Sequence, residues 1–406
     1  MTKELTHVAG GVTAPKGIRA AGVHAGFFPK KDRLDLALVV ADTDEPVAAG
    51  VFTQNRFCAA PVRVSREVLS DGKARAVILN AGNANAATGM PGLSTAREVA
   101  SRVAAALGCP EDQVLVASTG VIGVPLPMGP FEKGVPELVS KLSKEGGADA
   151  AHAIMTTDTH PKECAVSFEA NGVVYTVGGM CKGSGMIQPN VATMLCVITT
   201  DAPVTSEAAQ AALKAAADVS FNKLTVDSDT STNDSVFFLS SSAAGGERIG
   251  ESGKAYGAFE AALTEVCEDL ARQMASDGEG ATKLVTVYVN GAATPEDADK
   301  AARTVANSPL VKTAIAGHDC NWGRVAAALG RSGAAFNQED VDIDILGLPV
   351  CRAGLTVGFD EDEALKRFEE SEIVISADLH AGDCSTRVWT CDMTHDYITI
   401  NGSYRS

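Results

Sequence analysis

GSGMIQPNVATMLCVITTDA, residues 183–202, passes from a glycine-bracketed loop into an apolar run that is typical of a buried strand. Thr193 stands where the loop becomes the strand, directly after the small residues Val191 and Ala192. A β-branched residue that opens a strand needs no functional explanation. In the functional alternative, the Thr193 hydroxyl attacks the preceding carbonyl, the peptide shifts to an ester, and hydrolysis frees the threonine amine as the nucleophile's own general base. Ala192 leaves room for the tight turn that this attack requires.

The composition limits the classes of protein that remain. A chain of 406 residues is long enough for about two to three domains of roughly 150 residues each. Its 45% hydrophobic residues and 39 glycines are typical of a loop-rich α/β protein. A net charge of −17, with no run of Lys and Arg, argues against a nucleic-acid partner. No stretch of about 18 apolar residues is present, which argues against a membrane span.

Cysteine and histidine usage argues against a metal centre. The ten cysteines stand singly without a CxxC pair, and the seven histidines form no HExxH motif. We therefore expect reduced, mostly buried thiols and no structural metal. Residues 1–17 lack the apolar core of a secretory signal, which favours a cytoplasmic protein.

Strand and helix patterns alternate along the chain, which predicts an α/β protein of mixed α+β layers. The alternating runs on either side of Asn171 and Gly172 predict a β-hairpin. A second hairpin is expected between residues 35–42 and 47–53, and residues 396–403, DYITINGS, are expected to form a strand. The turn residues of NGAATPED, 290–297, indicate a soft domain boundary near residue 290.

Small polar loops follow several predicted strands, and α/β folds place their sites at such strand ends. The loop around Lys182, GGMCKGSG, lacks the GxxxxGK[ST] pattern of a phosphate-binding loop, so nucleotide binding is not expected. No GxSxG motif is present either, although a triad assembled from distant positions stays open.

The segment KGSGMIQPNVATMLCVITTDA, residues 182–202, contains Thr193 and looks like the cleavage-site signature of a known family. That family is the bifunctional ornithine acetyltransferase/glutamate N-acetyltransferase family of arginine biosynthesis, the ArgJ proteins. Further segments resemble the family in its order: NAGNANAATG (80–89), ASTGVIG (117–123), IMTTDTHPK (154–162), DGEGATK (277–283), HDCNWGRVAAALGRSG (318–333) and DYITINGSYRS (396–406). The resemblance covers essentially the whole chain.

The resemblance implies an N-terminal-nucleophile-type ornithine acetyltransferase/aminopeptidase fold. The core nucleophile domain would span residues 1–290, and a smaller C-terminal α/β domain would span 291–406. Self-cleavage is expected between Ala192 and Thr193, giving an α chain of 1–192 and a β chain of 193–406. Similar proteins form α2β2 assemblies or larger ones, so a heterotetramer is expected here.

The resemblance also implies roles for particular residues. Thr193 would be the nucleophile, and Thr119 with Gly120 would form the oxyanion hole. The substrate-binding residues implied are Thr156, Lys182, Thr193, Glu279, Asn401 and Ser406. Thr157 is an alternative to its neighbour Thr156.

The implied reaction is a ping-pong transfer of acetyl from N2-acetylornithine to glutamate through an acetyl-Thr193 ester. Substrates of this class need a cation for the carboxylate and an anion or amide for the ammonium. Lys182 and Glu279 supply one of each, although a lone loop Lys or Glu is more often a solvated charge. No cofactor is expected, and the residues leave open whether acetyl-CoA is a second donor.

Two other functions stay open. An N-terminal-nucleophile amidohydrolase or aminopeptidase of the same fold would pass the acyl group from Thr193 to water instead of to glutamate. A non-catalytic ligand-binding protein would keep an intact chain. Acceptor choice separates the first from the transferase, and the presence of two fragments separates the second.

Overall fold

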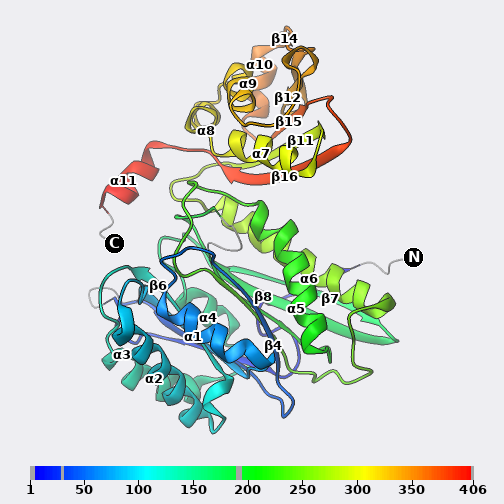
Figure 1. Ribbon diagram of the computed structural model, residues 1–406. Helices are drawn as coiled ribbons and strands as arrows, with labels where there is room; N and C mark the ends of the chain where they lie inside the picture. Colours follow the sequence, from blue (N-terminus) through cyan, green and yellow to red (C-terminus); the bar gives the residue numbers. More distant parts are fainter. Residues whose placement is uncertain (1–4, 29–31, 189–193, 404–406) are drawn as a thin grey trace.

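The computed structural model describes residues 5–28, 32–188 and 194–403, and the strands of these residues form three sheets (Figure 1). A six-stranded sheet has the order β1 (Thr6–His7), β7 (Lys162–Ala170), β8 (Val173–Lys182), β9 (Leu195–Thr200), β10 (Ser235–Ser240) and β4 (Val47–Phe52). A four-stranded sheet has the order β2 (Ile18–Val23), β3 (Leu36–Ala41), β5 (Ala76–Asn83) and β6 (Val114–Val121). The third sheet has the order β14 (Leu355–Thr356), β13 (Leu348–Arg352), β12 (Asp342–Ile345), β15 (Glu372–Asp378), β11 (Leu284–Ala292) and β16 (Cys384–Cys391).

Helices cover the outer faces of the first two sheets. The first six-stranded sheet, which contains β7 to β10, packs against α5 (Ser206–Val219) and α6 (Gly253–Ser276). The four-stranded sheet packs against α1 (Ala60–Val68), α2 (Gly89–Leu107) and α3 (Gly129–Lys141), while α4 (Gly147–Ala153) packs into the core between the two sheets. The remaining helices are α7 (Pro295–Ala306), α8 (Pro309–Ala316), α9 (Trp322–Gly330), α10 (Glu361–Arg367) and α11 (His395–Ser403). Short 3-10 turns occur at Leu69–Asp71, Glu111–Gln113, Phe221–Lys223 and Gln338–Asp340.

The sheet β1-β7-β8-β9-β10-β4 and the four-stranded sheet stack face to face, and this explains the continuous apolar runs in the sequence. Along β3, Leu38 and Val40 pack toward the helices, whereas Ala37 and Val39 pack into the core shared with the six-stranded sheet. Because successive side chains of a strand point to opposite faces, a strand buried on both sides is mostly apolar and does not alternate. The mixed α/β layers predicted from the sequence are therefore confirmed.

The predicted hairpin at Asn171 and Gly172 is confirmed. β7 and β8 pair antiparallel from Lys162 with Cys181 to Ala170 with Val173. Asn171 and Gly172 have φ angles of 51° and 78°, the left-handed conformation that a two-residue hairpin turn of this kind requires.

The second predicted hairpin is wrong. β3 pairs with β2 and β5, whereas β4 pairs with β10 in the other sheet. Both runs are apolar on both faces, so the sequence pattern shows two buried strands but not whether they share a sheet. The short connection between them crosses from one layer of the stack to the other.

The strand predicted for residues 396–403 is also wrong, because this segment forms helix α11. Tyr397, Ile398 and Thr399 favour strands by propensity. A strand needs a neighbouring edge for its backbone hydrogen bonds, whereas a helix makes them within the segment. The chain leaves the third sheet after β16 and reaches α11 on the side of the two stacked sheets (Figure 1).

The domain boundary predicted near residue 290 falls within β11, which belongs to the third sheet from Leu284 onward. This sheet has its own core, formed with α7, α8 and α9. All ten cysteines are free thiols. Within the described residues, no helix is long and apolar enough to cross a membrane.

Candidate active site

The two stacked sheets end at one cavity of about 190 Å³. β8 and β9 are antiparallel and β9 and β10 are parallel, so the end of β8 and the starts of β9 and β10 lie at the same edge. β5 and β6 are parallel, and residues at their ends, Ala84 and Thr119, face the same space. Strand ends of both sheets therefore line this one cavity, together with loops and helix α11.

The end of β6 brings two of the predicted residues to the cavity. Thr119 and Gly120 line it, and Gly120 pairs with Gly82 of β5. Gly120 has a φ of 130°, and a Cβ there would lie 2.4 Å from the carbonyl carbon of Gly82. Only glycine allows the two strands to come this close. No side chain therefore stands between the Gly120 backbone and the cavity.

Lys182 is the last residue of β8 and lines the cavity while its side chain is largely buried. The Lys182 Nζ lies 4.0 Å from Oδ2 of Asp158, whose side chain is completely buried. Asp158 also accepts a hydrogen bond of 2.7 Å from the backbone N–H of Gly183. One carboxylate thus contacts both the Lys182 ammonium and the start of the loop that leads toward Thr193.

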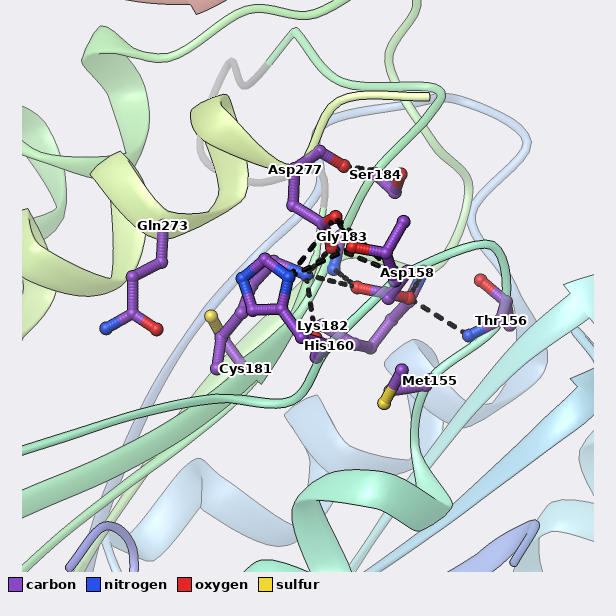
Figure 2. A network of polar contacts seen from close by, with 12 residues as sticks. Met155, Thr156, Asp158, His160, Cys181, Lys182, Gly183, Ser184, Gln273 and Asp277 are labelled. Atoms are coloured by element: carbon purple, nitrogen blue, oxygen red, sulfur yellow. Dashed lines mark hydrogen bonds and ion pairs between the residues drawn. The ribbon is translucent and has the colours of Figure 1, made fainter. Parts of the chain in front are cut away.

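Behind Lys182 lies a network of buried charges (Figure 2). Lys162, which is 0% exposed, donates to Asp158 Oδ1 at 2.8 Å and to Asp277 Oδ2 at 2.5 Å. The carbonyl of Asp277 accepts a bond of 2.6 Å from the Ser184 hydroxyl. The network therefore joins β7, the loop after α4, the loop after β8 and the end of α6.

The charge state of Asp158 follows from these neighbours. Burial raises the pKa of its carboxyl, but the positive charges of Lys182 and Lys162 lower it, and so do the hydrogen bonds that it accepts. The balance holds the pKa of Asp158 well below its usual range. Asp158 is therefore a carboxylate at neutral pH.

Cys181, next to Lys182, does not compete as a nucleophile. Its side chain is completely buried, and burial raises the pKa of the Cys181 thiol to about 12. The thiolate is the reactive form of cysteine, so this residue stays inert at neutral pH.

Glu279 and Asn401 form another part of the cavity wall. Asn401 of α11 donates from Nδ2 to Glu279 Oε2 at 2.7 Å. Gly185 makes room for the carboxylate, since a Cβ there would lie 2.4 Å from the Glu279 Cδ. The Glu279 backbone N–H donates to the Ser184 carbonyl at 2.9 Å, which fixes Glu279 against the same loop.

Asp227 ties this loop to α11. Its two carboxylate oxygens accept bonds of 2.6 and 2.7 Å from the backbone N–H groups of Met186 and Ile187. The Tyr397 hydroxyl of α11 donates to Asp227 Oδ2 at 3.3 Å. Burial and the nearby carboxylates raise the pKa of Tyr397, so its hydroxyl keeps its proton and remains a donor.

The cavity brings together the predicted site residues that the structure describes. Those residues are Thr119, Gly120, Thr156, Lys182, Glu279 and Asn401. Thr157 lines the cavity as well, so the choice between Thr156 and Thr157 stays open. Ala192, Thr193 and Ser406 lie outside the described residues, but Met194, the residue after Thr193, also lines the cavity.

Comparison with known proteins identifies the family. Residues 19–406 match the model of the ArgJ family. The chain is 52% identical over 400 residues to the arginine biosynthesis bifunctional protein ArgJ of Symbiobacterium thermophilum, covering 98% of this chain and 99% of that protein. The chain belongs to the ArgJ family.

Other ArgJ proteins agree with this assignment. The ArgJ protein of Geobacillus kaustophilus is 45% identical over 408 residues, with 100% of this chain and 98% of the relative covered. The crystal structure of the arginine biosynthesis bifunctional protein ArgJ from Bacillus halodurans is 44% identical with a TM-score of 0.51, and it covers 52% of this chain and 100% of its own. The family resemblance predicted from the sequence is therefore confirmed.

Sequence reasoning missed part of the ArgJ cavity wall, above all Asn233 in the loop before β10. Its Nδ2 donates to the Ala84 carbonyl at 2.6 Å and to the Ser118 carbonyl at 2.8 Å, which joins this loop to the ends of β5 and β6. The small polar run DSDTSTNDS, 227–235, is the signal that marks it, since such loops precede strands at many sites. The sequence does not show which strand ends the loop bridges.

One group among the described residues has the spacing of metal ligands. Ligand atoms of His7, Cys164 and Asp269 lie within 4.8 Å of one another. None of the three lines the cavity. The expectation that this ArgJ family member has no structural metal stays a prediction.

Proposed function

We propose that this protein transfers the acetyl group of N2-acetylornithine to glutamate, giving ornithine and N-acetylglutamate in arginine biosynthesis. The observation that carries the proposal is the convergence of Thr119, Lys182, Glu279 and Asn401, from separate parts of the chain, on one cavity beside Met194. ArgJ relatives along the full chain bear the name arginine biosynthesis bifunctional protein.

The charges of the cavity suit amino-acid substrates. Lys182 offers an ammonium for the substrate carboxylate, and Glu279 offers a carboxylate for a substrate ammonium. Asn401 holds Glu279 in place by its hydrogen bond of 2.7 Å. Because Lys182 is 8% exposed, its attraction to a carboxylate would be screened little by solvent.

The proposed chemistry is acyl transfer through Thr193. Its hydroxyl oxygen attacks the acetyl carbonyl carbon, and its own α-amine accepts the hydroxyl proton. The Thr119 hydroxyl and the Gly120 N–H donate to the oxyanion that forms. The C–N bond then breaks, the proton passes to the leaving amine, and ornithine departs. The amine of glutamate attacks the acetyl ester, which returns Thr193 to its starting state.

The α-amine of Thr193 is generated by self-cleavage. In this proposal the Thr193 hydroxyl attacks the Ala192 carbonyl, the peptide shifts to an ester, and water hydrolyses it. The products are the chains 1–192 and 193–406, and we propose that two copies of each assemble as α2β2. Ten free thiols suit a reducing compartment, which supports a cytoplasmic location.

The proposed reaction uses only groups of this chain and its substrates, so we expect it to proceed without a cofactor. The word bifunctional in the names of the relatives favours a second reaction, and acetyl-CoA is the donor that we propose for it. Replacing N2-acetylornithine by acetyl-CoA in the same assay tests this donor directly.

The experiment that tests the main proposal measures both products. Purified protein is incubated with N2-acetylornithine, with and without glutamate, and ornithine and N-acetylglutamate are quantified. We expect equal amounts of the two products, formed only when glutamate is present. An amidohydrolase would instead release ornithine and acetate at the same rate with or without glutamate.

A further inference from the structure

The buried network behind Lys182 has an uneven charge. Lys162 donates to both Asp158 and Asp277, and its third contact is the His160 carbonyl at 3.4 Å. One ammonium therefore faces two carboxylates, which leaves a net charge of −1 on three side chains that are at most 3% exposed. Buried charge of this kind needs a partner.

Lys182 supplies the missing positive charge, but from a distance. Its Nζ is 4.0 Å from Asp158 Oδ2, which is too long for a hydrogen bond. Asp158 Oδ1 is already occupied by Lys162 at 2.8 Å and by the Gly183 N–H at 2.7 Å. The Lys182 ammonium is thus attracted toward Asp158 without being bonded to it, and it still lines the cavity.

Beside Lys182, the backbone N–H of Thr156 also donates to Asp158 Oδ2 at 3.0 Å, whereas two further groups contact Asp277. His160 is half-exposed, and its Nδ1 lies 3.5 Å from Asp277 Oδ1. Thr159 donates to Asp277 from its backbone N–H at 3.1 Å and from its hydroxyl. These contacts involve Asp277, whereas Asp158 is the carboxylate that lies beside Lys182.

Without Lys162, Asp158 would lose its direct ionic partner. Lys182 is the next cation, and a movement of about 1 Å would bring its Nζ to the ordinary length of a charged hydrogen bond. The ammonium would then be withdrawn from the cavity and committed to Asp158.

We propose that Lys162 is a positioning residue. By forming the ion pair with Asp158, Lys162 keeps the Lys182 ammonium available to the substrate carboxylate. This role rests on the proposed function, because it assigns the substrate carboxylate to Lys182. Lys162 itself touches no substrate. Its effect on binding passes through Asp158 and not through Asp277.

A double-mutant cycle tests this route. Lys162→Met is introduced into the wild type, into Asp158→Asn and into Asp277→Asn, and KM is measured for N2-acetylornithine and for glutamate. The two double variants each remove one cation and one anion, so their buried charges match. Each single Asp→Asn variant serves as the reference for its own double variant.

We expect Lys162→Met to raise KM about tenfold or more in the wild type and in Asp277→Asn. In Asp158→Asn the same change should raise KM less than about threefold, because no carboxylate remains to withdraw Lys182. A purely structural role predicts equal effects of Lys162→Met in the two Asp→Asn backgrounds. Equal effects would overturn the inference.

Two controls separate this result from other failures. Lys214→Met removes a surface lysine that is paired with Asp218, and it should leave KM and the melting temperature unchanged. Lys162→Met alone leaves two buried carboxylates opposed by one lysine and can fail to fold, so the decision rests on the charge-matched double variants. Absence of transfer in the wild type would contradict the proposed function, whereas an active wild type with equal effects contradicts only the role of Lys162.

Discussion

Two walls of the cavity present opposite charges by different means. The Lys182 wall consists of Lys182, buried at the end of β8, and of Asp158, which lies behind it in the loop after α4 and is held by Lys162. The Glu279 wall, made of Glu279 and Asn401, combines a partly buried loop residue with an exposed residue of the C-terminal helix. The first wall is part of the sheet scaffold, and the second is completed by an element outside it.

One site can therefore be rigid at one wall and accessible at the other. Residues that are buried in many polar contacts open only with the surrounding structure, whereas exposed terminal elements open at low cost in free energy. We therefore expect changes in the Lys182 wall to affect binding strongly and folding as well. Changes in the Glu279 wall should affect binding moderately and folding little.

The largest effect is expected for Thr193→Ala, which belongs to neither wall. The chain should stay intact, with one band on a denaturing gel, and transfer activity should fall by at least about 10³-fold because the nucleophile is absent. Both walls remain, so the intact chain should still bind ornithine, which calorimetry measures. Fragments that still begin at residue 193 would contradict the assignment of the nucleophile.

Lys182→Met should have the next largest effect. Removing a buried cation that binds a carboxylate costs about 2–3 kcal/mol, so KM for N2-acetylornithine should rise roughly 100-fold. Steady-state kinetics at neutral pH measure this. Lys214→Met is the matched exposed control. A KM change below about threefold in Lys182→Met would contradict the proposal that Lys182 binds the substrate carboxylate.

Asn401→Ala tests the other wall. It deletes one hydrogen bond of 2.7 Å to the Glu279 carboxylate. A partly exposed bond to a charged group contributes about 1–1.5 kcal/mol, so KM should rise roughly tenfold with little change in melting temperature. Thr399→Ala on the same helix is the control, since its hydroxyl donates to the His395 carbonyl within α11. If Asn401→Ala weakens binding as much as Lys182→Met, the distinction between the walls fails.

The smallest effect is expected from acid, which should lower the stability of the protein by protonating Asp158 in the Lys182 wall. The folded pKa of Asp158 lies below its unfolded value of about 3.9, so its contribution to stability is complete above about pH 5 and is lost as the pH falls toward the folded pKa. Thermal unfolding between pH 6 and 3 should therefore show a steeper fall in melting temperature for wild type than for Asp158→Asn. Parallel curves would contradict a depressed pKa.

Local sequence patterns predicted much of the fold but not its layering. Asn171 and Gly172 determine a hairpin by their own backbone preferences, so that turn could be read from the sequence. Strands β3 and β4 could be recognised as buried but not assigned to separate sheets, because pairing depends on partners far along the chain. Residues 396–403 form a helix against their strand propensity, and a helix makes its backbone hydrogen bonds within the segment.

The site was predictable only where a family motif marked it. Thr119, Lys182 and Glu279 were each named through the resemblance, since a single loop residue of these types carries no signal of its own. The contact of Lys162 with Asp277 spans 115 residues of sequence, and that of Asn233 with Ala84 spans 149. Such contacts arise from the packing of whole sheets, which no local pattern records.

The strand order of the sheet β1-β7-β8-β9-β10-β4 has a consequence for the two chains that cleavage would create. Residues 1–192 would contribute β8 and β4, and residues 193–406 would contribute β9 and β10, which lie between them. Each fragment would therefore complete the other's sheet along two separate seams, β8 with β9 and β10 with β4. The two fragments would therefore depend on each other for folding, and neither would be expected to hold its native fold if produced alone.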